Sequence, residues 1–315
     1  MTSNLQVVRS IADLRVVVGQ WRNNGHKIAL VPTMGALHAG HLALVRRAGE
    51  LAGRTIVSIF VNPGQFAPHE DLARYPRDEA GDLGKLAAES CHLVWAPTVA
   101  EMYPEGFATR IQPTGAAQGL ESDFRPHFFG GVTTVCAKLF GATTPDVAVF
   151  GEKDYQQLCV VRQMARDLNM PLAIIGVPTT READGLALSS RNVYLSADER
   201  KVAPVLNGVL REVATKAQAA ASGVGGARTG KAPRPAPLVR DPTLPPQAHQ
   251  LPDLDAICAT AADELLAAGF SKVDYVAVRH AGTLKVVTQA GPARLRVLAA
   301  AWLGNTRLID NVGGD

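Results

Sequence analysis

Up to about residue 180, short apolar runs rich in β-branched residues alternate with segments of helical periodicity, and this alternation restricts the fold more than any other feature of the chain. The candidate strands are residues 28–31, 55–61, 92–95, 146–150 and 172–177, and the candidate helices between them are residues 42–52, 79–89, 132–139 and 156–168. Such alternation is typical of βαβ units, which assemble into a parallel, doubly wound sheet. The sequence therefore predicts an α/β fold.

Polar segments follow three of the expected strands. The carboxyl ends of parallel strands meet at one edge of a sheet, and ligands bind outside that edge. The three segments should therefore converge on one site. They read Thr33-Met34-Gly35-Ala36-Leu37-His38-Ala39-Gly40-His41, Asn62-Pro63-Gly64-Gln65-Phe66 and Gly151-Glu152-Lys153-Asp154-Tyr155-Gln156-Gln157.

Residues 32–41 are the most distinctive of these segments. A strand, a glycine-containing turn and a helix start would direct backbone N–H groups and the positive end of a helix dipole to one spot, which suits a phosphate. His38 and His41 would face that spot, and Gly40 would let the backbone approach a ligand closely. Two histidines at this spacing also arise by chance. On a helix, such a pair can instead be half of a metal site or part of a solvated face. The pattern is similar to the His-x-Gly-His motif of nucleotidylyltransferases, in which imidazoles contact phosphate oxygens.

The length and composition of the chain are typical of a globular protein. The 315 residues suggest two domains, and the 47% hydrophobic and 19% charged content is ordinary. We expect no membrane segment, because no apolar run approaches the roughly 20 residues that a span needs. The four cysteines are far apart and form no Cys-x-x-Cys pair, which favours reduced thiols and a cytoplasmic location.

The net charge of +3 is concentrated in residues 216–252, where five basic residues face one acid. This segment also holds seven of the 20 prolines and no Phe, Tyr or Trp. It is typical of a flexible Pro/Ala-rich insertion, with a tether to an acidic partner as the alternative. Because the rest of the chain is close to neutral, we expect no nucleic-acid partner.

Several sequence blocks, in order, resemble the pantothenate synthetase (pantoate–beta-alanine ligase) family of the HxGH nucleotidylyltransferase superfamily. The similarity covers about residues 5–210 and resumes from about 254 to the end. Its most specific parts are residues 32–41, 60–63 with Gln65-Phe66, Tyr75-Pro76-Arg77, Met102-Tyr103-Pro104, residues 150–157 and residues 181–192.

The resemblance implies a fold, a reaction and partners. The fold is a Rossmann-like ATP- and pantoate-binding domain (residues 1–181) with a smaller α+β C-terminal lid domain (residues 182–315). The pantoate carboxylate attacks the α-phosphorus of ATP, giving pantoyl adenylate and pyrophosphate, and beta-alanine then displaces AMP to form pantothenate. This is a ligase reaction that forms a C–N bond without an enzyme nucleophile. ATP as co-substrate, Mg²⁺ and a homodimer are implied as well.

The resemblance also carries over site residues. The implied ATP contacts are Met34, Gly35, Ala36, Leu37, His38, Ala39, Gly40, His41, Gly151, Glu152, Lys153, Asp154, Thr180, Leu188, Ser189, Ser190 and Arg191. Among these, the implied catalytic groups are His41 as proton donor, His38, Lys153, Ser189, Ser190 and Arg191. Pantoate and beta-alanine would contact Gln65, Gln157, Pro32 and Asn62. Asp82 is a weak candidate Mg²⁺ ligand, and we expect Gln156 to be a solvated residue of a helical first turn.

Two departures from the family pattern stand out. The chain reads Arg125-Pro126-His127-Phe128-Phe129 where the family has Arg-Pro-Gly-His-Phe, so His127 receives no role, and Ala39 replaces the usual acid. Two other functions remain open at this point: another nucleotidylyltransferase of the superfamily that acts on a phosphate acceptor, or a catalytically silent nucleotide-binding regulator.

Overall fold

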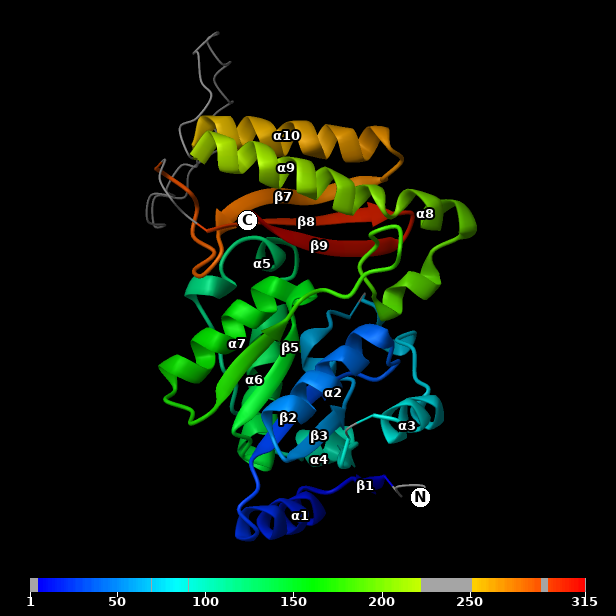
Figure 1. The fold of residues 1–315 in the computed structure, drawn as a ribbon, viewed down its shortest axis with the longest axis vertical. Coiled ribbons are helices and arrows are strands. Elements are labelled where there is room, and N and C mark those ends of the chain that lie inside the picture. The colour runs from blue at the N-terminus through cyan, green and yellow to red at the C-terminus, as the bar shows by residue number, and fades with distance from the viewer. Residues whose placement is uncertain (1–4, 69, 90, 222–250, 290–293, 315) are drawn as a thin grey trace. The chain divides into compact units, whose positions relative to one another are not determined.

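The computed structural model describes residues 5–68, 70–89, 91–221, 251–289 and 294–314, which form two compact units, residues 1–204 and 205–315 (Figure 1). The greater part of the expected insertion, residues 222–250, lies outside the described residues. Residues 216–221 are helical, so the expected start of the insertion at residue 216 is wrong. They continue the amphipathic pattern of the preceding turns and bury Ala217 and Ala221.

Unit 1 contains a six-stranded parallel sheet in the order β1-β4-β3-β2-β5-β6. The strands are β1 (Gln6–Val8), β2 (Ile28–Thr33), β3 (Arg54–Ile59), β4 (Leu93–Trp95), β5 (Val147–Gly151) and β6 (Ala173–Val177). All five strands expected from the apolar runs are present, and the predicted doubly wound α/β fold is confirmed.

Helices and 3-10 turns connect these strands. The α-helices of unit 1 are α1 (Ile11–Asn23), α2 (Ala39–Leu51), α3 (Glu79–Ala87), α4 (Val99–Met102), α5 (Glu121–Phe124), α6 (Phe128–Thr143), α7 (Tyr155–Asp167) and α8 (Ala197–Val202). The 3-10 turns are η1 (Pro63–Gln65), η2 (Asp71–Ala73), η3 (Gly115–Ala117), η4 (Glu152–Asp154) and η5 (Ser190–Tyr194). Side chains cap several helix starts. Ser10 accepts from Asp13 N at α1, and Ser196 and Glu199 form a capping box at α8.

The strand order reverses at β2, which lies between β3 and β5. From β2 the chain proceeds outward to β3 and β4, and it returns to the other side of β2 through β5 and β6. In an open α/β sheet, such a reversal leaves a crevice beyond the carboxyl ends of the two strands, where ligands bind. The loops that follow β2 and β5 are two of the three polar segments singled out in the sequence.

The core of unit 1 lies along the central strands. Ala29, Val31, Val57, Val94 and Val149 are fully buried. A parallel strand covered on both faces needs apolar residues throughout, which is why these strands appear in the sequence as continuous apolar runs.

Unit 2 is a three-stranded antiparallel sheet in the order β7-β8-β9, covered by two helices. The strands are β7 (Lys272–His280), β8 (Leu295–Leu303) and β9 (Thr306–Gly314), and the helices are α9 (Val205–Ala221) and α10 (Pro252–Ala267). The helices pack against each other and on the sheet, side by side in Figure 1. This agrees with the expected small α+β unit.

The division between the units follows Pro204, further along the chain than the boundary after residue 181 that the resemblance implied. Hydrogen bonds attach the intervening segment to unit 1. Arg191 pairs with Asp71, and the Tyr194 hydroxyl donates to the carbonyl of Arg74 at 2.9 Å. Among the described residues, no helix is long and apolar enough to cross a membrane.

Candidate active site

The chain turns sharply between β2 and α2. Gly35 and Ala36 both adopt left-handed backbone conformations, with φ of +82° and +51°. Glycine adopts this region freely, whereas an alanine there costs about 1–2 kcal/mol. Thr33 supports the start of the turn, because its Oγ1 donates to the carbonyl of Ser58 at 2.7 Å and accepts from Gly35 N at 3.3 Å.

Asp82 on α3 holds this strained turn. Its carboxylate is 1% exposed and accepts from Ala36 N at 2.8 Å and from Leu37 N at 2.7 Å. Lys85, one turn later, donates to the Leu37 carbonyl at 2.8 Å and lies 3.7 Å from Asp82 Oδ1. The buried charge is therefore paired and hydrogen-bonded, as burial requires. Both polar groups of the Leu37 backbone are fixed immediately before His38.

The two histidines of the motif are oriented by backbone N–H groups. His38 Nδ1 accepts from Gly40 N at 3.2 Å, and His41 Nδ1 accepts from His38 N at 3.3 Å. The ring centroids are 4.1 Å apart. A ring nitrogen that accepts an N–H bond carries no proton, so each neutral imidazole has its proton on Nε2. Gly40 is needed for this packing, because a Cβ at this position would lie 2.9 Å from His38 Cε1.

Both histidines are neutral near pH 7. Burial, assisted by the charges of Lys153 and Lys85 and partly offset by Asp154, lowers the pKa of His38 to about 4. Burial also lowers the pKa of His41 to about 3, assisted by His38, Lys153 and Lys85. The rings therefore offer Nε2–H donors rather than full positive charges. Lys153 and Lys85 therefore both act electrostatically on the two histidines.

Most backbone N–H groups at the start of α2 are engaged within the loop itself. Besides the bonds described above, His41 N and Leu42 N donate to the carbonyl of His38. This differs from the sequence-based expectation that these amides are directed at a phosphate. In residues 34–41, the structure describes no acceptor for the N–H groups of Met34 and Ala39. Few amides of this loop are therefore without a described acceptor, and the Nε2–H groups of the two imidazoles are its other donors.

The segment after β3 lies against residues 34–41, which we call the histidine loop. Asn62 caps η1 by accepting from Gly64 N at 3.2 Å, and its Nδ2 donates to Gln65 Oε1 at 3.1 Å. Gln65 Nε2 lies 3.1 Å from the sulfur of Met34. Two predicted site segments therefore touch through Met34 and Gln65.

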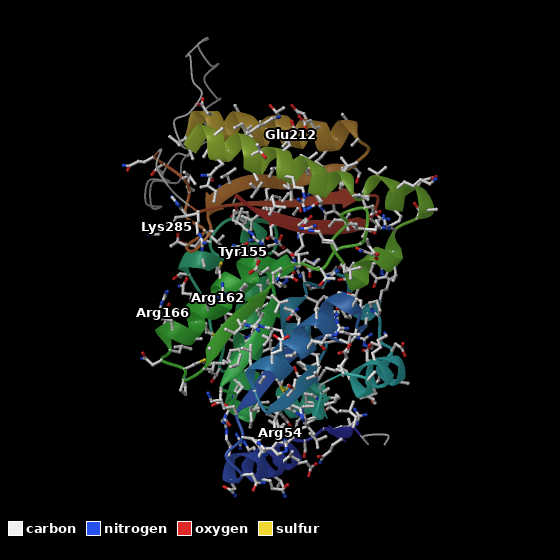
Figure 2. All side chains as sticks on the ribbon, in the orientation of Figure 1. Arg54, Tyr155, Arg162, Arg166, Glu212 and Lys285 are labelled. Carbon is white, nitrogen blue, oxygen red and sulfur yellow. The ribbon has the colours of Figure 1, made fainter. Side chains whose placement is uncertain are left out.

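The third segment begins at Gly151, the last residue of β5, and continues through η4 into α7. Glu152, Lys153, Asp154 and Gln157 are all half-buried at the same sheet edge. Lys153 Nζ lies 3.9 Å from Asp154 Oδ2. Tyr155 opens α7, and Figure 2 shows Arg162 and Arg166 further along that helix.

Gln156 is not the solvated residue that we expected. It is 3% exposed, its Oε1 accepts from Glu121 N at 3.1 Å, and its Nε2 donates to the carbonyls of Ala116 and Gly119. Neighbouring positions at a helix start can face opposite environments, and the sequence pattern does not show which one faces inward. Gln156 braces the preceding loop, whereas Gln157 stays half-buried.

Residues 180–190 return to the histidine loop. The Thr180 carbonyl accepts from Leu188 N at 3.0 Å, and a Cβ at Gly40 would lie 3.8 Å from the Cβ of Leu188. Ser189 caps η5 by accepting from Arg191 N at 3.3 Å. Ser190 Oγ lies 3.1 Å from the hydroxyl of Tyr75.

Arg191 is held by a carboxylate in this structure. Its Nε and Nη2 donate to Asp71 at 2.9 and 3.0 Å, and its guanidinium lies 5.6 Å from the Tyr75 ring centroid. Burial alone would lower the pKa of Arg191, but the Asp71 carboxylate outweighs it and the net pKa is raised. The side chain is therefore a fixed cation, and its Nη1 donors take no part in the pair with Asp71.

Residues 125–129, which differ from the family pattern, lie beside the segment that contains Gln65. Arg125 forms two bonds with Glu70, at 2.8 and 2.6 Å, and donates to the Gln65 carbonyl at 3.2 Å. His127 Nε2 lies 3.8 Å from Glu70 Oε1. His127 is therefore near the site without touching Gln65 through a described hydrogen bond.

Sequence reasoning missed several residues that support the site. Tyr103 donates to Asn62 Oδ1 at 2.7 Å, and Gly131 brings the backbone of α6 against Gly64. Asp71 holds Arg191. The Met102-Tyr103-Pro104 block was the sole sequence signal for any of them, and it gave Tyr103 no role.

Asp82, the candidate magnesium ligand, binds the backbone of the loop in this structure. Among the described residues, no three His, Cys, Asp or Glu side chains are grouped to hold a metal ion. Both oxygens of Asp82, the one candidate ligand, already accept backbone N–H bonds. The geometry fits Asp82 as an anchor of the loop, and its role as a ligand stays a prediction.

The reversed sheet order, the imidazole donors at the start of α2 and the adjoining polar segments define an α/β nucleotide-binding enzyme of the HxGH type. The profile of the family described as Pantoate-beta-alanine ligase matches residues 6–313. The chain belongs to this family, whose members are ligases that form a C–N bond. The resemblance noted in the sequence is thereby confirmed.

Individual relatives agree over the whole chain. It is 53% identical over 310 residues to the pantothenate synthetase of Mesorhizobium japonicum, covering 98% of each chain. The pantothenate synthetase structure from Thermus thermophilus superposes with a TM-score of 0.79 at 41% identity, covering 98% of this chain and 99% of that one. The pantoate-beta-alanine ligase from Francisella tularensis, complexed with Beta-gamma ATP and beta-alanine, superposes with a TM-score of 0.74 at 29% identity, covering 98% of this chain and 97% of that one.

Proposed function

We propose that the chain condenses pantoate with beta-alanine in two steps at the edge of the sheet in unit 1. A pantoate carboxylate oxygen attacks the α-phosphorus of ATP, and the bond from that phosphorus to pyrophosphate breaks. The amine of beta-alanine then attacks the acyl carbon of pantoyl adenylate. The acyl C–O bond breaks, AMP leaves with that oxygen, and the amine loses a proton.

The contact between Gln65 and Met34 carries this proposal. Gln65 belongs to the segment assigned to pantoate, and Met34 to the loop assigned to ATP, and their side chains lie 3.1 Å apart. A carboxylate held by Gln65 is therefore adjacent to the phosphates bound by the histidine loop. Holding two reactants side by side removes much of the entropic barrier to their reaction.

The histidines and Lys153 are assigned to the charge that develops on the phosphates. His38 and His41 donate Nε2–H bonds, and Lys153 supplies a positive charge that is mostly buried. Donors that are already oriented stabilise developing charge without reorganising during the reaction. Because His41 is neutral, its part in this proposal is hydrogen-bond donation, and full proton transfer to pyrophosphate is not needed.

The remaining assignments follow the same division. Asn62, Gln65, Gln157 and Pro32 are assigned to pantoate and beta-alanine, whose carboxylates and hydroxyls suit neutral amides. A neutral amide orients a carboxylate without withdrawing its charge. The other ATP contacts are assigned to Gly151, Glu152, Asp154, Thr180, Leu188, Ser189, Ser190 and Arg191.

Magnesium is proposed to enter with ATP as its phosphate complex, since Mg²⁺ commonly keeps phosphate and water ligands. We also propose that the enzyme is a homodimer in the cytoplasm, where its co-substrate ATP is made. Sedimentation equilibrium tests the dimer: a mass near 33.3 kDa, that of one chain, would overturn this part.

Product analysis tests the proposed function. Incubation with ATP, Mg²⁺, pantoate and beta-alanine is expected to yield AMP, pyrophosphate and pantothenate in equal amounts, with no AMP when pantoate is omitted. Nucleotidyl transfer to a phosphate acceptor in place of pantoate would support another nucleotidylyltransferase. Nucleotide binding without turnover would support a silent regulator.

A further inference from the structure

The amide of Asn62 can face only one way. The side chain is 1% exposed, and four groups surround it. Gly64 N, 3.2 Å from Oδ1, can only donate, and the Gly131 carbonyl, 3.2 Å from Nδ2, can only accept. Turning the amide by 180° would place N–H against N–H and oxygen against oxygen in a buried site, which costs about 1–3 kcal/mol for each unsatisfied group.

This fixed orientation is passed on to Gln65. Asn62 Nδ2 donates to Gln65 Oε1 at 3.1 Å, so the Gln65 oxygen faces Asn62 and its Nε2 faces Met34, 3.1 Å from the sulfur. A thioether is a weak acceptor. A carboxylate or hydroxyl oxygen would replace it readily, so Gln65 offers a donor to a ligand that accepts.

Tyr103 completes the arrangement from the opposite side. A hydroxyl can donate or accept, but Asn62 Oδ1 accepts, so the Tyr103 hydroxyl donates to it at 2.7 Å. Burial raises the pKa of Tyr103 to about 12, which keeps this proton in place. Phe107 packs edge-on against the ring, and Lys138 lies 5.8 Å from the ring centroid.

We propose that Tyr103 is a positioning residue for pantoate: through Asn62, it fixes the amide of Gln65 with its N–H groups available to the pantoate carboxylate. This rests on the proposed function, which places pantoate at Gln65. An N–H group that faces the ligand selects ligands that accept hydrogen bonds. A carboxylate, which has no proton to donate, is such a ligand. It follows that the polarity of the Gln65 amide contributes to specificity for a carboxylate, with Asn62 as its source and Tyr103 as a further donor that stabilises the Asn62 orientation.

The first test is Tyr103→Phe, which keeps the ring and removes the hydroxyl. Steady-state kinetics should show the KM for pantoate raised about tenfold, the equivalent of one typical hydrogen bond, with the KM for ATP unchanged. Tyr194→Phe is the matched control, because it removes the hydrogen bond from a partly exposed hydroxyl to the Arg74 carbonyl. Its KM for pantoate should equal that of the wild type.

The second test shows whether Tyr103 acts through Asn62. In Asn62→Asp, both oxygens accept, so the Gln65 amide must turn its Nε2 toward residue 62 and its oxygen toward pantoate. The KM for pantoate should rise more than in Tyr103→Phe. Adding Tyr103→Phe to Asn62→Asp should raise it by less than twofold, because residues in one network do not act additively.

The outcomes separate this inference from the proposed function. Wild-type protein that forms no pantoate-dependent AMP would overturn the proposed function. Active wild type with a pantoate KM within twofold in Tyr103→Phe would overturn the inference alone. Equal rises in the KM values for pantoate and ATP, or full additivity in the double variant, would overturn it as well, since they indicate a general structural role.

Discussion

His41 Nδ1 accepts a hydrogen bond from the backbone N–H of His38 at 3.3 Å, and this contact fixes where the proton of the neutral His41 ring resides. With Nδ1 occupied, Nε2 carries the proton. Burial lowers the pKa of His41 to about 3. The motif therefore supplies an oriented, uncharged donor in the ligand-free enzyme, and this has consequences for stability and for catalysis.

Protein stability should depend on pH through His41. In the unfolded chain its pKa is near 6.5, whereas in the fold it is about 3. Between these values the unfolded state binds more protons. The free energy of unfolding therefore has its full value, as far as His41 affects it, above about pH 6.5. It falls as the pH decreases, by up to about 1.4 kcal/mol per pH unit from this group. Urea denaturation at pH 5.0 and 7.0 measures the effect.

His41→Gln is the control for this pH dependence, since glutamine does not titrate. The difference in unfolding free energy between pH 7.0 and 5.0 should be smaller in His41→Gln than in the wild type. An equal difference in the two proteins would show that His41 has an ordinary pKa in the fold.

His41→Gln also tests whether His41 acts in catalysis as a hydrogen-bond donor or as a charge. His41→Ala should slow pantoyl adenylate formation in single turnover by about two to three orders of magnitude, as the loss of a donor to developing charge often does. His41→Gln keeps an N–H donor and should retain more of the rate than His41→Ala. A normal rate in His41→Ala would remove His41 from the mechanism. Equal rates in the two variants would show that hydrogen-bond donation is not what His41 contributes.

Substitution of Asp82 should affect the histidine loop without changing the requirement for magnesium. Asp82→Asn places an NH₂ group against one of the two loop amides, so kcat/KM for ATP should fall by about one to two orders of magnitude. The Mg²⁺ concentration for half-maximal rate should stay the same. Asp78→Asn, at the N-cap of the same helix, is the control and should be near wild type, because asparagine also caps well. Recovery of the Asp82→Asn rate at high Mg²⁺ would indicate a metal ligand instead.

Gly131 should be intolerant of a side chain. A Cβ there would lie 2.1 Å from the Gly64 carbonyl oxygen and 2.7 Å from Gln65 Cα, which are backbone atoms that cannot rotate away. Gly131→Ala should raise the KM for pantoate and lower the unfolding free energy by about 1–3 kcal/mol. At Gly130 the nearest atom is Gln112 Oε1, the end of a flexible side chain. Gly130→Ala should therefore leave the pantoate KM unchanged, and a similar rise there would contradict the packing explanation.

The strands β2, β3, β4 and β5 could be predicted because they are largely buried and form continuous apolar runs. The edge strand β6 is only partly buried, but its sequence is also an apolar run. β1 was missed because it has three residues, Gln6–Val8, at the edge of the sheet. The α9 helix continues to Ala221 in a segment whose composition had indicated a loop. Local composition does not show that its alanines are buried by tertiary packing.

The site residues could be predicted where they are close in sequence, as His38 and His41 are. Their supports could not, because they come from distant segments. Asp82 reaches the amides of Ala36 and Leu37 from another helix, and Tyr103 reaches Asn62 from a separate loop. The sequence did single out Asp82, but a lone carboxylate gives no indication of whether it binds a metal or a backbone.

The central claim is that an oxygen of pantoate attacks the α-phosphorus of ATP and leaves with AMP. Pantoate labelled with ¹⁸O in both carboxylate oxygens tests this most directly, with AMP and pantothenate examined by mass spectrometry after a single turnover with beta-alanine. The predicted result is one ¹⁸O atom in each AMP and one in each pantothenate. Unlabelled AMP, or ADP as the nucleotide product, would contradict an acyl adenylate intermediate.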